Sequence, residues 1–196
     1  MMNYSLSFLV GVIFGIIPFS YMLGRLRGVD LRNVGSGNIG AANLGRSLGL
    51  RFFILGFVLD ALKGIIPVLL SHSLFDYGTF AGAGAILGHI FNPFFGFRGG
   101  KGIATTIGVA VSLAARSFAL SLGIWLLVYL TTMLVSLASL CFSVALPFFS
   151  FFLRDGTLAD RLLFILIAIM VFFAHRSNIR RLIRGKEAKT VLWRRK

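Results

Sequence analysis

The chain has 196 residues, of which 57% are hydrophobic and 13% are charged, and its mean hydropathy is +0.90. Because about a quarter of the residues in a soluble domain are charged, this composition excludes an ordinary soluble domain and predicts a single membrane domain over residues 1–196. The formal net charge is +14, but the cations cluster in loops beside apolar runs, which favours membrane topology and phosphate binding over binding of nucleic acid.

Apolar segments of membrane length follow one another along the chain. A helix needs about 20 apolar residues to cross a bilayer, and shorter helices are tolerated where protein covers them. We predict spans near residues 4–24, 52–71, 79–92, 103–115, 117–133, 135–153 and 157–175. The first segment lacks a cationic start and a cleavage site, so we expect it to be retained as a span. The predicted fold class is an all-α integral membrane protein with seven transmembrane helices.

The connection after the first span contains a glycine-rich loop, GSGNIGAANLGR, which ends at Arg46. Glycines let backbone N–H groups converge on an anion, and a neighbouring arginine neutralises it. The loop mimics the G-x-G-x-x-G dinucleotide fingerprint, but that fingerprint follows a β-strand, and here a membrane helix precedes it. The candidate phosphate and polyol ligands in this loop are Ser36, Gly37, Asn38, Asn43 and Arg46.

Two charged residues, Asp60 and Lys63, lie inside the second predicted span. They are three residues apart and share a helix face, where a charge in the membrane costs about 2.5–3.5 kcal/mol. We therefore expect them to pair, to face the protein interior and to support the site structurally.

A second glycine-rich loop, GHIFNPFFGFRGGKG, separates the third and fourth spans. It is not a Walker A loop, because an earlier glycine is missing and Gly102 replaces the Ser or Thr that would bind Mg²⁺. An ordinary interfacial turn is the alternative, and it explains the cations but not the density of glycines. The candidate substrate ligands are Asn92, Arg98, Gly99, Gly100, Lys101 and Gly102.

The last predicted span leads into the basic segment HRSNIRRLIRGKE. His175 and Asn178 are three residues apart and would share a face if the helix continued. A histidine suits proton transfer with a hydroxyl group near neutral pH. The alternative is a basic tail that holds anionic lipid, and it accounts for most of the cations from Arg180 to Lys196.

Most of the 20 Lys and Arg residues lie in the two glycine-rich loops and the tail. The positive-inside rule places these segments in the cytoplasm, which puts the N-terminus outside and the C-terminus inside. Such an arrangement needs an odd number of spans, and seven satisfies it.

Over nearly the whole chain, these motifs and the Asp60–Gly64 element resemble the PlsY family of bacterial acyl-phosphate:glycerol-3-phosphate acyltransferases. The resemblance implies an inner-membrane protein with its active site facing the cytoplasm. Such an enzyme moves a fatty acyl group from acyl phosphate to the sn-1 hydroxyl of glycerol 3-phosphate, giving lysophosphatidic acid and phosphate. Long-chain acyl phosphate, glycerol 3-phosphate and membrane lipids are the implied partners. We expect no nucleic acid partner, no cofactor, no metal and a monomeric protein.

The resemblance also implies roles for individual residues. Ser36 and Arg46 match the family's essential serine and arginine, and His175 and Asn178 match its essential third-motif pair. The glycines of the second loop match its acyl-phosphate-binding segment. Glu187 matches a glutamate tied to structural integrity. With Lys101, these matches complete a predicted catalytic set of Ser36, Arg46, Lys101, His175 and Asn178.

An acyl phosphate is already activated, so we expect direct transfer without a covalent acyl-enzyme. Second-loop amides with Lys101 would hold the leaving phosphate and the developing oxyanion, while Arg46, Ser36 and Asn178 would orient glycerol 3-phosphate. Either His175 or a substrate phosphate would take the hydroxyl proton. The alternative functions are a membrane phosphate or anion transporter, against which the absence of an internal repeat speaks, and a scaffold that binds anionic lipid through its tail.

Overall fold

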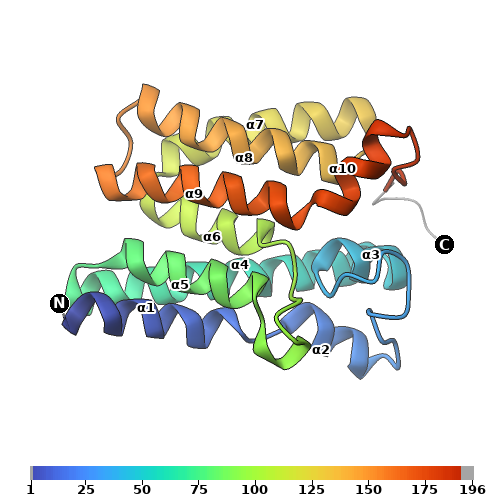
Figure 1. The fold of residues 1–196 in the computed structure, drawn as a ribbon, viewed down its shortest axis with the longest axis horizontal. Coiled ribbons are helices and arrows are strands. Elements are labelled where there is room, and N and C mark those ends of the chain that lie inside the picture. The colour runs from blue at the N-terminus through green and yellow to red at the C-terminus, as the bar shows by residue number, and fades with distance from the viewer. Residues whose placement is uncertain (1, 191–196) are drawn as a thin grey trace. The chain divides into compact units, whose positions relative to one another are not determined.

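The computed structural model describes residues 2–190, and every regular element among them is a helix (Figure 1). The backbone contacts divide between Val109 and Ala110 into two compact units. The helices of the first unit are α1 (Met2–Gly15), α2 (Phe19–Leu26), α3 (Ala41–Leu48), α4 (Leu50–Phe75), α5 (Gly78–Ile90), the short 3-10 helix η1 (Pro93–Phe95) and the start of α6 (Ile103–Leu113). The second unit contains the end of α6, then α7 (Ala115–Thr132), α8 (Val135–Phe152), α9 (Leu158–Ala174) and α10 (Arg176–Ile183).

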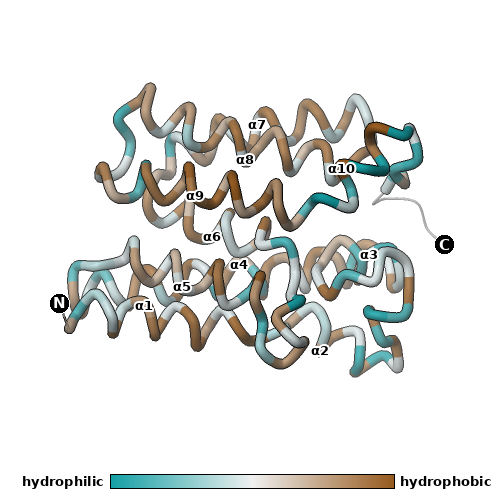
Figure 2. Tube along the Cα trace, in the orientation of Figure 1, coloured by the Kyte–Doolittle hydropathy of each residue, from teal (hydrophilic) through white to brown (hydrophobic). Residues whose placement is uncertain are grey.

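A helix coincides with each of the seven predicted spans. By length and composition, four segments can cross a membrane: α1 with α2, α4, α7 and α8. The bent pair of α9 and α10 makes a fifth candidate, and α6 is a shorter apolar helix. The all-helical prediction is confirmed for the described residues, whereas the count of seven spans and the sidedness stay predictions. Figure 2 shows hydrophobic residues along most of α1, α8 and α9, and hydrophilic residues in the connections and α10.

Close backbone packing joins α1 to α5, which lie side by side in Figure 1. A Cβ added to Gly11 would overlap the carbonyl oxygen of Ala81, and one added to Gly15 would overlap that of Ala85. On the α5 side, a Cβ at Gly84 would overlap the carbonyl oxygen of Phe8. The small residues therefore let two helix backbones touch.

The first predicted span is not one continuous helix, because it breaks at residues 16–18 between α1 and α2. Pro18 explains the break, since proline lacks the N–H group that would continue the helical hydrogen bonds. The two carbonyls freed there are satisfied by distant side chains. Asn92 donates from Nδ2 to the oxygen of Ile16 at 2.7 Å, and Lys63 donates from Nζ to the oxygen of Ile17 at 2.8 Å.

The predicted ion pair inside the second span is present and supports this break. Lys63 Nζ lies 3.0 Å from an oxygen of Asp60, and both side chains are almost completely buried. Ser20, just after the break, donates its hydroxyl to the other oxygen of Asp60 at 2.6 Å. The pair thus ties α4 to both ends of the interrupted helix.

In the second unit, α8 contacts both α7 and α9. Asp155, in the connection after α8, accepts hydrogen bonds from the backbone and hydroxyl of Ser117 at 2.8 and 2.9 Å. Thr157 and Asp160 form a capping box at the start of α9. These contacts hold the connection 153–157, which joins α8 to α9, against the start of α7 and the start of α9.

Two elements differ from the expected pattern. The first glycine-rich loop contains a short helix, α3, that the apolar periodicity did not indicate. The last span ends where it was predicted to end, because α9 stops at Ala174, and the helix does not continue straight, since α10 is bent from α9 by 63°. His175 lies at the bend, and both its backbone N–H and its side chain bind the carbonyl of Val171. His175 and Asn178 are therefore not on one straight helix face.

Candidate active site

Asn43 organises the first glycine-rich loop from within α3. Its side chain is buried, and its Oδ1 accepts a hydrogen bond from the backbone N–H of Ser36 at 3.0 Å. Its Nδ2 donates to the carbonyls of Leu31 and Val34 at 2.9 and 3.0 Å. Because both ends of the amide hold the loop, Asn43 shapes the site from behind.

The exposed hydroxyl of Ser36 is joined to Arg46 on α3. Nη2 of Arg46 donates to Oγ of Ser36 at 2.9 Å. Gly37 has a positive φ of 68°, and Asn38 accepts from the N–H of Gly40 at 3.1 Å, so a tight turn carries the serine. A guanidinium beside a hydroxyl at an accessible loop is suited to hydrogen bonding with a phosphate.

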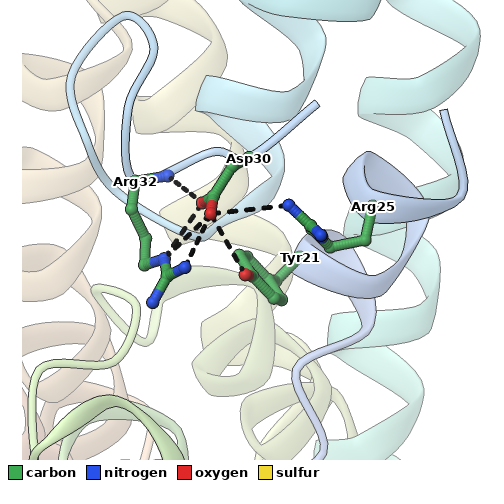
Figure 3. Close-up of polar contacts among 4 residues, drawn as sticks. All are labelled: Tyr21, Arg25, Asp30 and Arg32. Atoms are coloured by element: carbon green, nitrogen blue, oxygen red, sulfur yellow. Dashed lines mark hydrogen bonds and ion pairs between the residues drawn. The ribbon is translucent and has the colours of Figure 1, made fainter. Parts of the chain in front are cut away.

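The carboxylate of Asp30 binds three neighbouring side chains in the segment that leads from α2 into this loop (Figure 3). Asp30 accepts three hydrogen bonds from the Arg32 side chain at 2.6 to 3.2 Å and one from its backbone N–H at 3.0 Å. Arg25 forms an ion pair with Asp30 at 3.6 Å, and the hydroxyl of Tyr21 donates to it at 3.4 Å. The hydrogen bond from Arg32, helped by the charge of Arg25, holds the pKa of Asp30 well below its usual range. Asp30 therefore stays charged and anchors the loop to α2.

The second glycine-rich loop folds back onto the end of α5. Asn92 accepts from the N–H of Phe94 at 3.0 Å and so caps η1, while its Nδ2 is the group that binds Ile16. The N–H of Gly99 donates to the carbonyl of Ile90 at 2.9 Å, and that of Gly100 donates to the carbonyl of His89 at 3.1 Å. Two of the amides predicted to bind phosphate are thus engaged with α5.

Another set of amides lies directly after these glycines. Gly102 has a positive φ of 83°, and its carbonyl accepts from the N–H of Thr106 at 2.7 Å, which is the first helical bond of α6. The N–H groups in the first turn of a helix have no acceptor within the helix and attract anions. Lys101 precedes this turn, and Arg98 lies exposed in the loop.

In the second unit, Glu187 connects three side chains. One carboxylate oxygen accepts from Ser136 Oγ at 2.8 Å and from Asn178 Nδ2 at 2.6 Å, and the other accepts from Arg181 Nε at 2.6 Å. Burial alone would raise the pKa of Glu187, but the hydrogen bonds from Arg181, Asn178 and Ser136 outweigh it and lower the pKa. The carboxylate therefore fixes the orientation of Asn178 on α10.

The hydrogen bond of His175 defines its tautomer. Nδ1 lies 2.9 Å from the carbonyl oxygen of Val171, and the side chain is 2% exposed. A carbonyl oxygen only accepts, so Nδ1 carries the hydrogen, and Nε2 is the basic nitrogen of the neutral ring.

The structure thus brings the predicted residues together in local groups. The first loop gathers Ser36, Gly37, Asn38, Asn43 and Arg46; the second gathers Asn92, Arg98, Gly99, Gly100, Lys101 and Gly102; and the second unit joins Asn178 to Glu187, with His175 three residues before it. Asp60, Lys63 and Asn92 meet around the helix break. That the three groups share one cavity stays a prediction.

Sequence reasoning missed His89, Ser136 and Asp30. His89 is the second residue of the GHIFNPFFGFRGGKG motif and lies in the last turn of α5, and its position beside Gly88 was the available signal. Ser136 gave none, because its partner Glu187 is 51 residues away, whereas the signal for Asp30 was local, since Arg32 and Arg25 lie close to it in the sequence. Among residues 2–190, no group of three His, Cys, Asp or Glu side chains is placed to hold a metal ion, and independence from metal stays a prediction.

These features define the class of protein: an all-helical membrane protein with two glycine-rich loops suited to anions. The family model described as glycerol-3-phosphate acyltransferase matches residues 5–185, and the chain belongs to this family. The glycerol-3-phosphate acyltransferase of Aquifex aeolicus is 40% identical over 177 residues, covering 88% of this chain and 92% of its relative. That of Thermosipho melanesiensis is 37% identical over 190 residues, covering 96% and 94%.

Two solved structures are similar to this chain over nearly its whole length. Both are of PlsY (YgiH), described as an integral membrane glycerol 3-phosphate acyltransferase. The glycerol 3-phosphate form has a TM-score of 0.89 and 37% identity, and the lysophosphatidic acid form has a TM-score of 0.87 and 35% identity. Each match covers 95% of this chain and 94% of the other. The predicted family is confirmed, and the chain is an integral membrane protein. The transporter and scaffold alternatives gain no support.

Proposed function

We propose that this protein transfers a fatty acyl group from acyl phosphate to the sn-1 hydroxyl of glycerol 3-phosphate, forming lysophosphatidic acid and phosphate. One observation carries the proposal: the chain matches, over 95% of its length, solved forms of an acyltransferase with glycerol 3-phosphate and with lysophosphatidic acid. These two molecules are the acceptor and the product of the proposed reaction.

Charge control is what this reaction needs from the protein. Each substrate carries a phosphate with about −1.5 to −2 charges near neutral pH, by analogy with phosphoesters. Arg46 and Ser36, which are joined at 2.9 Å, would hold the phosphate of glycerol 3-phosphate together with Asn178. Lys101 and the first turn of α6 would hold the phosphate of the donor and the developing oxyanion.

The chemical step in this scheme is a direct displacement. Nε2 of His175 takes the proton of the attacking hydroxyl, because Nδ1 is committed to Val171. The new C–O bond forms as the bond between the acyl carbon and the phosphate oxygen breaks, and phosphate leaves with the electron pair. The alternative is that a substrate phosphate accepts this proton, and the other parts of the step would then be unchanged.

The proposal includes the membrane arrangement. A single domain of seven spans, with the N-terminus outside and the C-terminus in the cytoplasm, puts both glycine-rich loops and α10 on the inner side of a bacterial plasma membrane. The helix at each predicted span and the cluster of arginines in the 25–51 connection support this arrangement. The protein works as a monomer in this scheme.

The test is an assay with purified protein, acyl phosphate and glycerol 3-phosphate, in which phosphate and lysophosphatidic acid are both measured. We expect equal amounts of the two products, and no product when acyl-CoA replaces acyl phosphate. Phosphate release without lipid product would overturn the proposal.

A matched pair of variants tests the assigned arginine. Arg46→Met should lower kcat/KM by at least about tenfold, because it removes a donor aimed at a phosphate. Arg51→Met removes an exposed cation at the start of α4 and should leave kcat/KM within about twofold. Equal effects of the two substitutions would mean that only the overall positive charge matters.

The base is tested by His175→Gln. Loss of turnover with an unchanged KM for glycerol 3-phosphate agrees with a histidine base. The fall in turnover at acidic pH, which protonation of the base causes in the wild type, should then be absent from the pH profile of the variant. Near-full turnover of the variant would assign the proton to a substrate phosphate.

A further inference from the structure

Tyr21 lies in the first turn of α2, directly after the break in the first predicted span, and is half-buried. Its hydroxyl donates to Asp30 at 3.4 Å, and the guanidinium of Arg32 lies over its ring, 5.5 Å from the ring centre (Figure 3). A guanidinium at such a distance is attracted to the face of an aromatic ring. Tyr21 therefore contacts the segment that enters the first glycine-rich loop with both its hydroxyl and its ring.

The same ring contacts the second glycine-rich loop. The ring of Phe95, in η1, lies edge-on to that of Tyr21, with 4.8 Å between the ring centres. In the same loop Phe94 and Phe97 are 72% and 67% exposed, whereas Phe95 is half-buried. Phe95 is thus the most buried of these three phenylalanines, and Tyr21 is its ring partner.

On the side of the first loop, a short series of hydrogen bonds leads from Asp30 to Ser36. Leu31 follows Asp30 and is completely buried, and its carbonyl accepts from Nδ2 of Asn43 at 2.9 Å. Oδ1 of the same asparagine accepts from the N–H of Ser36 at 3.0 Å. Ser36 is therefore held in a defined place relative to Asp30, which Tyr21 contacts.

On the side of the second loop, hydrogen bonds attach Phe95 to the residues that precede Lys101. The carbonyl of Phe95 accepts from the N–H of Arg98 at 3.1 Å. Asn92 caps η1 and donates from Nδ2 to the carbonyl of Ile16 at 2.7 Å, in the break before α2. The second loop is thus attached to the region of the helix break both by an aromatic contact and by a hydrogen bond.

We propose that Tyr21 is a positioning residue that sets the distance between the two substrate loops. This inference rests on the proposed function, in which the first loop holds glycerol 3-phosphate and the second holds acyl phosphate. Two bound molecules react when the attacking and attacked atoms lie about 3–3.5 Å apart, and a displacement of about 1 Å can lower the rate about 100-fold. A shift of one loop against the other would therefore lower turnover while each loop still binds its own substrate.

The experiment is a double-mutant cycle between Tyr21 and Phe95 in the purified protein, in which kcat and the KM for each substrate are measured. Tyr21→Leu and Phe95→Leu should each lower kcat about fivefold, which is the scale of one aromatic contact. The double variant should also lose about fivefold, instead of the about 25-fold expected for independent effects, because both changes remove the same contact. The KM for glycerol 3-phosphate and that for acyl phosphate should each stay within about twofold, since the hydrogen bonds inside each loop remain.

Two further variants are the controls. Tyr21→Phe keeps the ring against Phe95 and loses only the long hydroxyl contact with Asp30, so kcat should stay within about twofold. Tyr4→Leu is the matched control, because the ring of Tyr4 on α1 lies 4.9 Å from that of Phe80 on α5, outside both loops. It should lower the thermal unfolding midpoint in detergent and leave kcat within about twofold.

The outcomes separate the possibilities. A shared fall in kcat that does not multiply in the double variant, at unchanged KM, supports the inference. Falls in kcat that multiply, an effect confined to KM, or a fall of the same size in Tyr21→Phe or Tyr4→Leu overturns it.

Phe95→Leu keeps the test decisive if Tyr21→Leu does not fold, since an unchanged kcat of Phe95→Leu overturns the inference by itself. If the wild-type protein forms no lysophosphatidic acid from acyl phosphate, the proposed function fails. If the wild type forms it and the variants match its kcat, the proposed function stands and this inference alone fails.

Discussion

Replacing Glu187 by alanine tests how the second unit holds Asn178. The carboxylate accepts two hydrogen bonds, from Ser136 at 2.8 Å and Asn178 at 2.6 Å, and pairs with Arg181 at 2.6 Å. A hydrogen bond to a charged group contributes about 1.5–3 kcal/mol, and an ion pair with a partly exposed partner contributes about 0–1 kcal/mol. Since such terms are not additive, we expect Glu187→Ala to lower the free energy of unfolding by about 3 kcal/mol.

Glu187→Gln is the matched control. Its amide oxygen still accepts from Ser136 and Asn178, but the ion pair with Arg181 is lost, so the expected loss is about 1 kcal/mol. An unfolding titration in mixed detergent micelles measures both values. Turnover should fall more for the alanine variant, because Asn178 loses the acceptor that orients it. If the two variants lost the same free energy, the carboxylate oxygen would not be holding Ser136 and Asn178, and the reasoning would be refuted.

Three further predictions concern the pH dependence, the helix contact and the buried ion pair. Because hydrogen bonds hold the pKa of Glu187 below its ordinary value of 4.5, its contribution to stability is present above about pH 4.5 and is lost as the pH falls further. The difference in unfolding free energy between wild type and Glu187→Gln should therefore stay constant from pH 7 to about pH 5 and narrow only below about pH 4.5 in unfolding titrations. Gly11→Ala should destabilise the protein by about 1–3 kcal/mol through overlap with α5, whereas Gly123→Ala, which meets nothing within 4 Å, should be neutral; equal unfolding midpoints would contradict the backbone contact. Lys63→Met leaves the buried charge of Asp60 without its cation and should lower the free energy of unfolding by about 3–5 kcal/mol. If the double variant Lys63→Met with Asp60→Asn regains stability, the unpaired charge of Asp60 is the cause of the loss.

The helices themselves could be predicted from the sequence because membrane length and apolar composition are local properties. The pairing of Asp60 with Lys63 could be predicted for the same reason, since residues three apart on a helix are neighbours. The interruptions of the helices had local signals in the sequence. Pro18 marks the break of the first span, and the basic residues after Ala174 mark the end of α9.

The part of the site that could not be predicted depends on contacts between distant segments. Asn92 was predicted to bind substrate, which stays a prediction; in the structure its Oδ1 caps η1 and its Nδ2 donates to the carbonyl of Ile16. The N–H groups of Gly99 and Gly100 were predicted to bind phosphate, which also stays a prediction; in the structure they donate to carbonyls at the end of α5. A glycine-rich sequence indicates close approach of the backbone to something, and only the fold says whether that partner is an anion or another part of the chain.

The interrupted first helix has a consequence for how the protein is made. As the chain leaves the ribosome, Ile17 emerges 46 residues before Lys63, and Ile16 emerges 76 residues before Asn92. Carbonyl groups without donors cost several kcal/mol each in hydrocarbon, so α1 and α2 cannot settle in lipid by themselves. We therefore expect the amino-terminal segment to insert stably only after α4 and the segment following α5 have supplied these two donors.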